Sequence, residues 1–314
     1  MPRCAIIGFG SIGQELKRQL LEKKWSVNYI INSVDITDSG GNIIDTSSSW
    51  KKYHDIDVVF LAVPSSLGAV AEKYILFYAS KKIPVITCEK GALSEYYETL
   101  SAKLPLIGYS ATVGGGTRMI PFLNLRDKEH ISEICGIING TLNYIFTELS
   151  IGKAQQEVLD SVLEKKYAEP GAATLLDIIA GELGDLSRKA VILANAMGIS
   201  AAPLKWESDL CSIDTFLIEK TLQNPQEYRF FIIITNHEYS GFIGGMKMQI
   251  GNWWVYAGLF LIKNTHFPLT EGVTNILTIV EGEDTYSITG PGAGPRATAR
   301  AMILDAISLI KNRK

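Results

Sequence analysis

Short apolar runs alternate with helical patterns over the first 130 residues of the chain. Strand-sized runs stand at 4–7, 27–31, 57–63, 84–87 and 104–107. Leu16, Leu20 and Leu21 follow the first run at helical spacing, and further helical patterns cover 67–80 and 91–102. A regular alternation of strand and helix is typical of βαβ units. It predicts an α/β fold that begins with a doubly wound parallel sheet.

The pattern changes after about residue 130. We expect a strand at 131–138 and helices at 140–150, 154–165, 181–197 and 213–222. Longer β-branched and aromatic strands follow at 228–235, 242–250, 253–262, 276–280 and 285–288, before a last helix at 297–310. This predicts an α+β substrate-binding and dimerisation domain at 131–289. Residues 1–130 then form the first domain, which 290–314 complete.

Composition and charge favour a small-molecule partner. The chain has 314 residues, 46% of them hydrophobic, and a formal net charge of −3, which argues against nucleic acid or a polybasic membrane contact. The apolar runs are shorter than the roughly 20 residues of a membrane span, and no signal peptide is expected before the first strand. Four cysteines without C-x-x-C spacing fit a reducing cytoplasm, and we assign none of them to catalysis or metal.

A glycine-rich turn joins the first strand to the first helix. Glycines in such a turn let backbone N–H groups approach a pyrophosphate and let the helix pack on the strand, so a Rossmann-like dinucleotide site is expected. Its residues are Gly8, Phe9, Gly10, Ser11, Ile12 and Gly13. Asn32 and Ser33 stand where an acid would hold the ribose of NAD or an arginine the phosphate of NADP. The choice between NAD and NADP stays open.

Other strand ends and a late glycine loop add to the expected coenzyme site. Val63 and Pro64 follow one strand, and Lys90 follows the next, where open sheets bind ligands. A lysine merely near a helix start is the alternative for Lys90. A second glycine-rich segment, with Gly290, Gly292 and Gly294, leads into the last helix and suggests a return to the nucleotide domain, although a plain turn would look similar.

Two opposite charges lie one turn apart on an apolar side of the helix expected at 181–197. At 100° per residue, Asp185 and Lys189 fall beside Leu186, Ile192 and Leu193. Desolvation shifts the pKa of such groups, and a lysine shifted toward neutrality can exchange a proton near pH 7. The alternatives are an ordinary surface pair or a buried structural pair.

Together these segments resemble the homoserine dehydrogenase family, whose members interconvert L-homoserine and L-aspartate 4-semialdehyde with NAD or NADP. The most selective pieces are Asn139-Gly-Thr-Leu-Asn-Tyr144 and Gly184-Asp-Leu-Ser-Arg-Lys189. The glycine loop, Val85–Leu93, Ala111–Gly116, Tyr167–Pro170 and Gly290–Gly294 also match, in order along nearly the whole chain.

The resemblance implies roles for particular side chains. Lys189 would transfer the proton, Asp185 and Glu169 would hold the ammonium and hydroxyl groups of the substrate, and Lys90 would line the same pocket. Its floor would be shaped by Gly140, Thr141 and Tyr167. The family also implies a homodimer formed through the sheet of the second domain, and a last helix folded back on the dinucleotide domain.

Three positions depart from the family pattern. Ser110 replaces a glutamate that helps the family hold a monovalent cation, so a sodium or potassium site is doubtful. Lys166 replaces a glycine before Tyr167. The spacing between Glu169 and Asp185 is long, which leaves Asp177 as the alternative to Glu169 at the substrate; we expect Glu169. No appended regulatory module is expected after the last helix.

Two other functions fit parts of this pattern. One is a related reductase of another amino-acid aldehyde or keto acid, with a pocket altered by Ser110 and Lys166. The other is a non-catalytic nucleotide-binding paralogue, which the joint presence of Lys90, Asp185 and Lys189 disfavours.

Overall fold

The computed structural model describes residues 1–64, 66, 68–168, 171–208, 213–264, 267–292 and 294–311. The chain divides into two compact units, Met1–Arg118 with Ala293–Lys314, and Met119–Gly292. The divisions fall after 118 and 292, where we expected 130 and 289. The short helix α5 (Met119–Leu123) accounts for the first difference, because it packs against α8 (Leu175–Met197) of the second unit.

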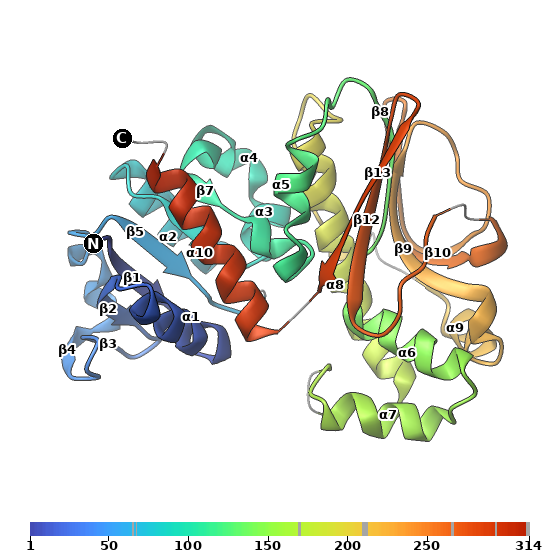
Figure 1. The fold of residues 1–314 in the computed structure, drawn as a ribbon, viewed down its shortest axis with the longest axis horizontal. Coiled ribbons are helices and arrows are strands. Elements are labelled where there is room, and N and C mark those ends of the chain that lie inside the picture. Colours follow the sequence, from blue (N-terminus) through green and yellow to red (C-terminus); the bar gives the residue numbers. More distant parts are fainter. Residues whose placement is uncertain are drawn as a thin grey trace. The chain divides into compact units, whose positions relative to one another are not determined.

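A seven-stranded sheet organises the first unit, in the order β4-β3-β2-β1-β5-β6-β7 (Figure 1). The strands β2, β1, β5, β6 and β7 run parallel, as the sequence predicts, whereas β3 and β4 extend the sheet as antiparallel hairpins that the sequence did not reveal. The bounds are β1 Arg3–Ile7, β2 Ser26–Ile31, β3 Asp35–Thr37, β4 Ile43–Thr46, β5 Val58–Leu61, β6 Val85–Thr87 and β7 Ile107–Gly108.

The last helix of the chain, α10 (Pro295–Lys311), belongs to the first unit, as expected. α1 (Ser11–Glu22) and α10 pack against each other (Figure 1), and both contribute to a core with β1 and β5. The other helices are α2 (Gly68–Ser80), α3 (Gly91–Glu95) and α4 (Tyr97–Leu100). The fold thus confirms the doubly wound α/β architecture.

Residues 91–107 differ from expectation. The helix expected at 91–102 is two short helices, α3 and α4, which separate at Tyr96. The strand expected at 104–107 shrinks to β7, because a 3₁₀ segment that contains Pro105 occupies Ser101–Leu106. Proline has no N–H to donate to a sheet, which opposes a longer strand here.

A six-stranded antiparallel sheet organises the second unit, in the order β10-β11-β9-β8-β12-β13. The long helix α8 packs on β11 and β9. The strands are β8 Ile131–Ile137, β9 Tyr228–Thr235, β10 Phe242–Ile250, β11 Trp253–Leu261, β12 Thr274–Glu281 and β13 Asp284–Pro291. The remaining helices are α6 (Gly140–Ser150), α7 (Gln155–Glu164) and α9 (Thr215–Leu222), so the α+β prediction is confirmed.

Helix α8 begins six residues before the expected Gly181, and a capping box explains why. The Thr174 hydroxyl accepts a hydrogen bond from the Asp177 backbone N–H at 3.1 Å. The Asp177 carboxylate in turn accepts from the Thr174 N–H at 2.8 Å. These bonds satisfy backbone donors that a helix start leaves unpaired. The helix ends at Met197, and the next residue, Gly198, caps it with a positive φ of 79° that suits glycine.

Among the residues that the structure describes, no helix combines the length and apolarity needed to cross a membrane.

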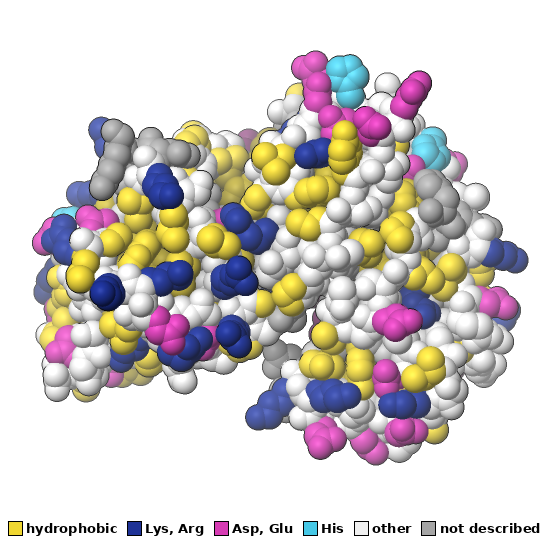
Figure 2. Space-filling view, viewed as in Figure 1, with side chains coloured by type: hydrophobic (Ala, Val, Ile, Leu, Met, Phe, Trp, Pro, Cys, Tyr) yellow, Lys and Arg dark blue, Asp and Glu magenta, His cyan; other side chains and the backbone are white. Residues whose placement is uncertain are grey.

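In the region of α6 and α7 in Figure 2, basic and acidic side chains are intermixed on the surface. Lys153, for example, pairs with Glu148 at 2.5 Å.

Candidate active site

The glycine loop of the first unit has the geometry that a dinucleotide needs. Gly8 has φ +86°, and a Cβ there would lie 2.4 Å from the Ala62 carbonyl oxygen. A Cβ on Gly13 would lie 2.2 Å from the Gly8 oxygen, so α1 packs closely on the loop. At Gly10, by contrast, a Cβ would meet nothing within 4 Å. The loop therefore leaves open space at the N-terminus of α1, where backbone N–H groups favour a phosphate.

The remaining expected coenzyme residues of this unit lie at strand ends. Asn32 and Ser33 follow β2 directly, and Val63 and Pro64 lie just beyond β5. The β1–α1 turn is bonded to the tip of β2, since the Gly8 N–H donates to the Ile31 carbonyl at 2.9 Å. The coenzyme roles of these residues stay predictions.

Lys90 stands at the start of α3, beside a buried carboxyl group that the sequence analysis did not single out. The Glu89 carboxylate accepts hydrogen bonds from the N–H groups of Gly91 at 2.5 Å and Ala92 at 2.7 Å. Burial raises the pKa of Glu89 to about 7, although both N–H groups favour its charged form. Glu89 thus fixes the backbone that carries Lys90. Lys90 belongs to the first unit, and its role at a substrate stays a prediction.

The late glycines are not one loop. Gly290 lies inside β13, opposite Asn275 of β12. A Cβ on Gly292 would lie 2.4 Å from the Asn275 side-chain oxygen, which explains the glycine by close packing. Gly294, with φ +104°, immediately precedes α10. The expected loop at 290–294 is therefore wrong for Gly290, and a coenzyme role for the three glycines remains untested.

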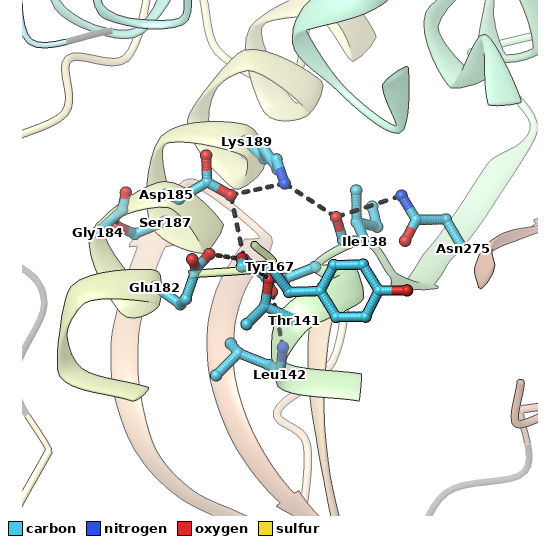
Figure 3. Close-up of polar contacts among 11 residues, drawn as sticks. Ile138, Thr141, Leu142, Tyr167, Glu182, Gly184, Asp185, Ser187, Lys189 and Asn275 are labelled. Atoms are coloured by element: carbon cyan, nitrogen blue, oxygen red, sulfur yellow. Dashed lines mark hydrogen bonds and ion pairs between the residues drawn. The ribbon is translucent and has the colours of Figure 1, made fainter. Parts of the chain in front are cut away.

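In the second unit, α8 brings Asp185 and Lys189 together (Figure 3). The Lys189 Nζ lies 2.6 Å from the Asp185 Oδ2 and donates to the Ile138 carbonyl oxygen at 3.0 Å. The two side chains are 12% and 25% exposed, so the pair is neither a solvated surface pair nor sealed in the core. Asn275 donates to the same carbonyl at 3.4 Å.

Asn139 connects this ion pair to the start of α6. Its side-chain oxygen accepts from the Leu142 N–H at 2.9 Å and so caps the helix. Its side-chain nitrogen donates to Asp185 at 3.2 Å and to Glu182 at 2.5 Å. One buried amide thus serves as a helix cap and as the donor to two carboxylates.

The next residues of the Asn139–Tyr144 motif hold neighbouring segments. Gly140 packs on Val273, where a Cβ would lie 3.1 Å from the backbone oxygen. The Thr141 hydroxyl donates to the Tyr167 carbonyl at 2.7 Å, as Figure 3 shows. Tyr167 also meets the Tyr144 ring edge-on at 5.2 Å. The structure therefore gathers Gly140, Thr141 and Tyr167 at the start of α6, while Glu169 lies outside the described residues.

The three departures noted in the sequence have structural accounts where they are described. The Asp177 carboxylate is engaged in the α8 capping box, which makes it a structural group. Lys166 has φ +56°, the left-handed region that favours glycine, at the end of α7. The Ser110 N–H and hydroxyl donate to the Asp305 carboxylate of α10 at 2.9 and 2.7 Å.

Glu182 is the residue of this site that the sequence analysis missed. It precedes Asp185 by three residues, so helical spacing already places both on neighbouring lines of α8. This spacing could have identified Glu182 from the sequence alone. Its contact with the Asn139 amide, 43 residues away, could not be predicted from the helical pattern.

The homoserine dehydrogenase family model matches residues 120–307. Two relatives named homoserine dehydrogenase, from Methanocaldococcus jannaschii and Saccharomyces cerevisiae, are 28% and 24% identical. The alignments cover 98% of both chains in the first case and 97% in the second.

Solved structures share the fold. A homoserine dehydrogenase from Thermoplasma acidophilum has a TM-score of 0.70 at 18% identity, and the match covers 99% of both chains. A hyperthermophilic archaeal homoserine dehydrogenase in complex with NADPH has a TM-score of 0.73 at 18% identity, covering 99% of this chain and 98% of that one. Because the family model spans more than half of the sequence, this chain belongs to the homoserine dehydrogenase family.

Proposed function

We propose that this protein interconverts L-homoserine and L-aspartate 4-semialdehyde, with Lys189 as the general acid and base. Membership of the family makes it an NAD(P)-dependent oxidoreductase that acts on a CH–OH group. The observation that carries the proposal is the Lys189 amine, held 2.6 Å from Asp185 and 3.0 Å from the Ile138 carbonyl. Two fixed partners restrict this flexible side chain to one position, which positioned proton transfer requires.

When bound, the coenzyme would supply the hydride acceptor. The residues described above would supply proton transfer and the binding of the substrate. In the oxidative direction, the Lys189 amine takes the proton of the substrate hydroxyl and becomes an ammonium. In the reductive direction, its ammonium form donates a proton to the developing alkoxide. A positioned proton donor of this kind contributes about 10²- to 10⁴-fold to the rate.

Carboxylates suit the ammonium group of an amino-acid substrate. Asp185 and Glu182 converge on the Asn139 amide, which holds the two negative groups close together, and Asp185 also pairs with Lys189. A substrate ammonium placed here would gain charge-assisted hydrogen bonds. By resemblance we assign Glu169 to the same task. Lys90 would line the substrate pocket.

The coenzyme would be held by the glycine loop. Gly10 and the first residues of α1 would offer backbone N–H groups to the pyrophosphate, as the open space at Gly10 supports, while Gly8 and Gly13 permit the close packing of the loop. Asn32, Ser33, Val63 and Pro64 would border it at the strand ends.

The test is a steady-state assay with L-homoserine and each oxidised coenzyme, in the wild type and three variants. We expect Lys189→Ala to lower kcat by about a hundredfold or more while coenzyme affinity is kept. Lys189→Arg should be equally slow, because arginine retains the charge but cannot release a proton near neutral pH. Lys205→Ala, an exposed lysine of the same unit, is the matched control.

Near-normal turnover of Lys189→Ala would remove Lys189 from the role. Faster turnover of another amino-acid aldehyde or of a keto acid, in a substrate panel, would favour the related reductase instead. Absence of turnover with any of these substrates, while coenzyme still binds, would favour a non-catalytic paralogue.

We also propose a cytoplasmic homodimer formed through the six-stranded sheet, as the resemblance implies. The buried free thiols of Cys4, Cys88 and Cys135 suit a reducing compartment. Light scattering of the purified protein tests the dimer directly.

A further inference from the structure

The tip of β2 is the part of the first unit where coenzyme selection is expected. In dinucleotide folds, an acid near the end of the second strand bonds the ribose 2′-hydroxyl of NAD, whereas an arginine accommodates the 2′-phosphate of NADP. In this chain Asn32 occupies the first position after β2, and no acid is visible there in sequence.

The fold brings a carboxylate back to this position. The chain turns after Asn32 and returns as β3, so that the Asn32 N–H donates to the Asp35 carbonyl at 2.9 Å. The Asn32 side-chain nitrogen donates to the Asp35 carboxylate at 3.1 Å. Asp35 is half-buried, and its carboxylate is therefore oriented by the residue at the strand tip.

The turn between these residues is anchored. The Ser47 N–H donates to the Val34 carbonyl and its hydroxyl donates to the Ser33 carbonyl, both at 3.0 Å. These bonds tie the turn to the segment after β4 (Ile43–Thr46). The Asn32 and Asp35 side chains consequently sit on a fixed backbone.

The surrounding segment carries no positive charge. Residues 32–49 contain Asp35, Asp38 and Asp45 but neither lysine nor arginine. The Asp38 carboxylate serves its own turn, where it accepts from the Gly40 N–H at 2.8 Å and from the Asn42 N–H at 2.9 Å.

The first lysines after this segment have partners of their own. Lys52 lies 3.4 Å from the Asp45 carboxylate. The Lys51 amine lies 5.7 Å from the centre of the Trp50 ring. The glycine loop Gly8–Gly13 also contains no lysine or arginine. A 2′-phosphate at the β2 tip would therefore meet the Asp35 carboxylate without a cation from these segments.

We propose that Asp35, oriented by Asn32, makes this protein select NAD(H) over NADP(H). The carboxylate accepts a hydrogen bond from a ribose hydroxyl and repels a 2′-phosphate, so it acts as both the attractive and the repulsive element of specificity. The inference rests on the dinucleotide-binding part of the proposed function, and it does not depend on which substrate is oxidised.

Direct titration with NADH and with NADPH, followed by coenzyme fluorescence, tests this without catalysis. We expect NADH to bind the wild type about tenfold or more tightly than NADPH. Asp35→Asn should narrow the ratio, mainly through tighter NADPH binding, because the repulsive charge is gone. Asp38→Asn removes the same charge from the same segment and should leave the ratio unchanged. Adding Ser33→Arg at the exposed turn to Asp35→Asn should strengthen NADPH binding beyond that of Asp35→Asn alone.

The outcomes separate the two proposals. NADPH binding as tight as NADH in the wild type, or an equal change of the ratio in Asp35→Asn and Asp38→Asn, would overturn the role of Asp35 and leave the proposed function standing. Binding of neither coenzyme would overturn both.

Discussion

The amide of Asn139 joins a helix cap to the carboxylates of Glu182 and Asp185, the second of which pairs with Lys189, so its removal should affect stability and catalysis together. Asn139 is only 4% exposed, and its side chain makes one hydrogen bond as acceptor and two as donor. Substituting a capping residue by alanine costs about 1 kcal/mol. A hydrogen bond to a charged group contributes about 1.5–3 kcal/mol.

Asn139→Ala removes the cap and both bonds to carboxylates, and should therefore lower the free energy of unfolding by about 4 kcal/mol or more. Asn139→Ser keeps a capping oxygen but loses the donor, and should recover about 1 kcal/mol of this loss. Asn139→Asp also keeps the cap, but it places a third carboxylate beside Asp185 and Glu182. The free energy of unfolding that Asn139→Asp loses should become smaller as the pH falls toward the ordinary carboxyl pKa of about 4, because protonation relieves the repulsion among the carboxylates.

Calorimetry of the three variants, together with kcat in the homoserine assay, measures both effects. All three should lower kcat, since Asp185 loses the Asn139 donor that helps to orient it, and Asp185 in turn holds Lys189. Asn139→Ala within about 0.5 kcal/mol of the wild type, with unchanged kcat, would refute the linking role. Equal stability of Asn139→Ser and Asn139→Ala would refute the share assigned to the cap.

Two further predictions concern a buried acid and the glycine loop. Burial raises the pKa of Glu133 in β8 to about 7, so the folded protein keeps this proton to higher pH than the unfolded chain does. The protonated side chain therefore contributes fully to stability below about pH 4.5, and this contribution is lost as the pH rises through 7. Glu133→Gln should then exceed the wild type by up to about 3 kcal/mol at pH 8 but not at pH 4, as measured by denaturant unfolding, and a constant difference across this range would contradict the assignment. Gly10→Ala should weaken coenzyme binding with little change in melting temperature, whereas Gly13→Ala should lower both, because only the second Cβ collides with the Gly8 oxygen; equal melting temperatures of the two variants would count against the loop geometry.

The elements that the sequence predicted well are those with long periodic patterns. α6 and β10 have the expected bounds, and the parallel core of the first sheet follows from its apolar runs. The hairpin strands β3 and β4 are only three and four residues long and partly polar, so no alternation could reveal them. The early start of α8 had a signal in Thr174 and Asp177, a capping pair that the apolar period alone does not show.

The candidate site divides in the same way. The pairing of Asp185 with Lys189 follows from helical spacing within one element, and the structure confirms it at 2.6 Å. The contacts from Asn139, Ile138 and Asn275 join segments distant in sequence, and only tertiary packing decides them. Asp35 was missed for a similar reason, since its proximity to Asn32 depends on a hairpin turn.

The packing of α10 against α1 has a consequence for biosynthesis. The ribosome makes α10 only after the whole second unit has been synthesised, so the first sheet emerges early while one of its covering helices is still missing. The middle of the chain can then complete its own fold before the beginning does, the reverse of the usual N-terminal-first order. Until α10 packs against the nascent first unit, apolar residues such as Leu16 and Leu20 stay partly exposed to solvent, where chaperones can bind them.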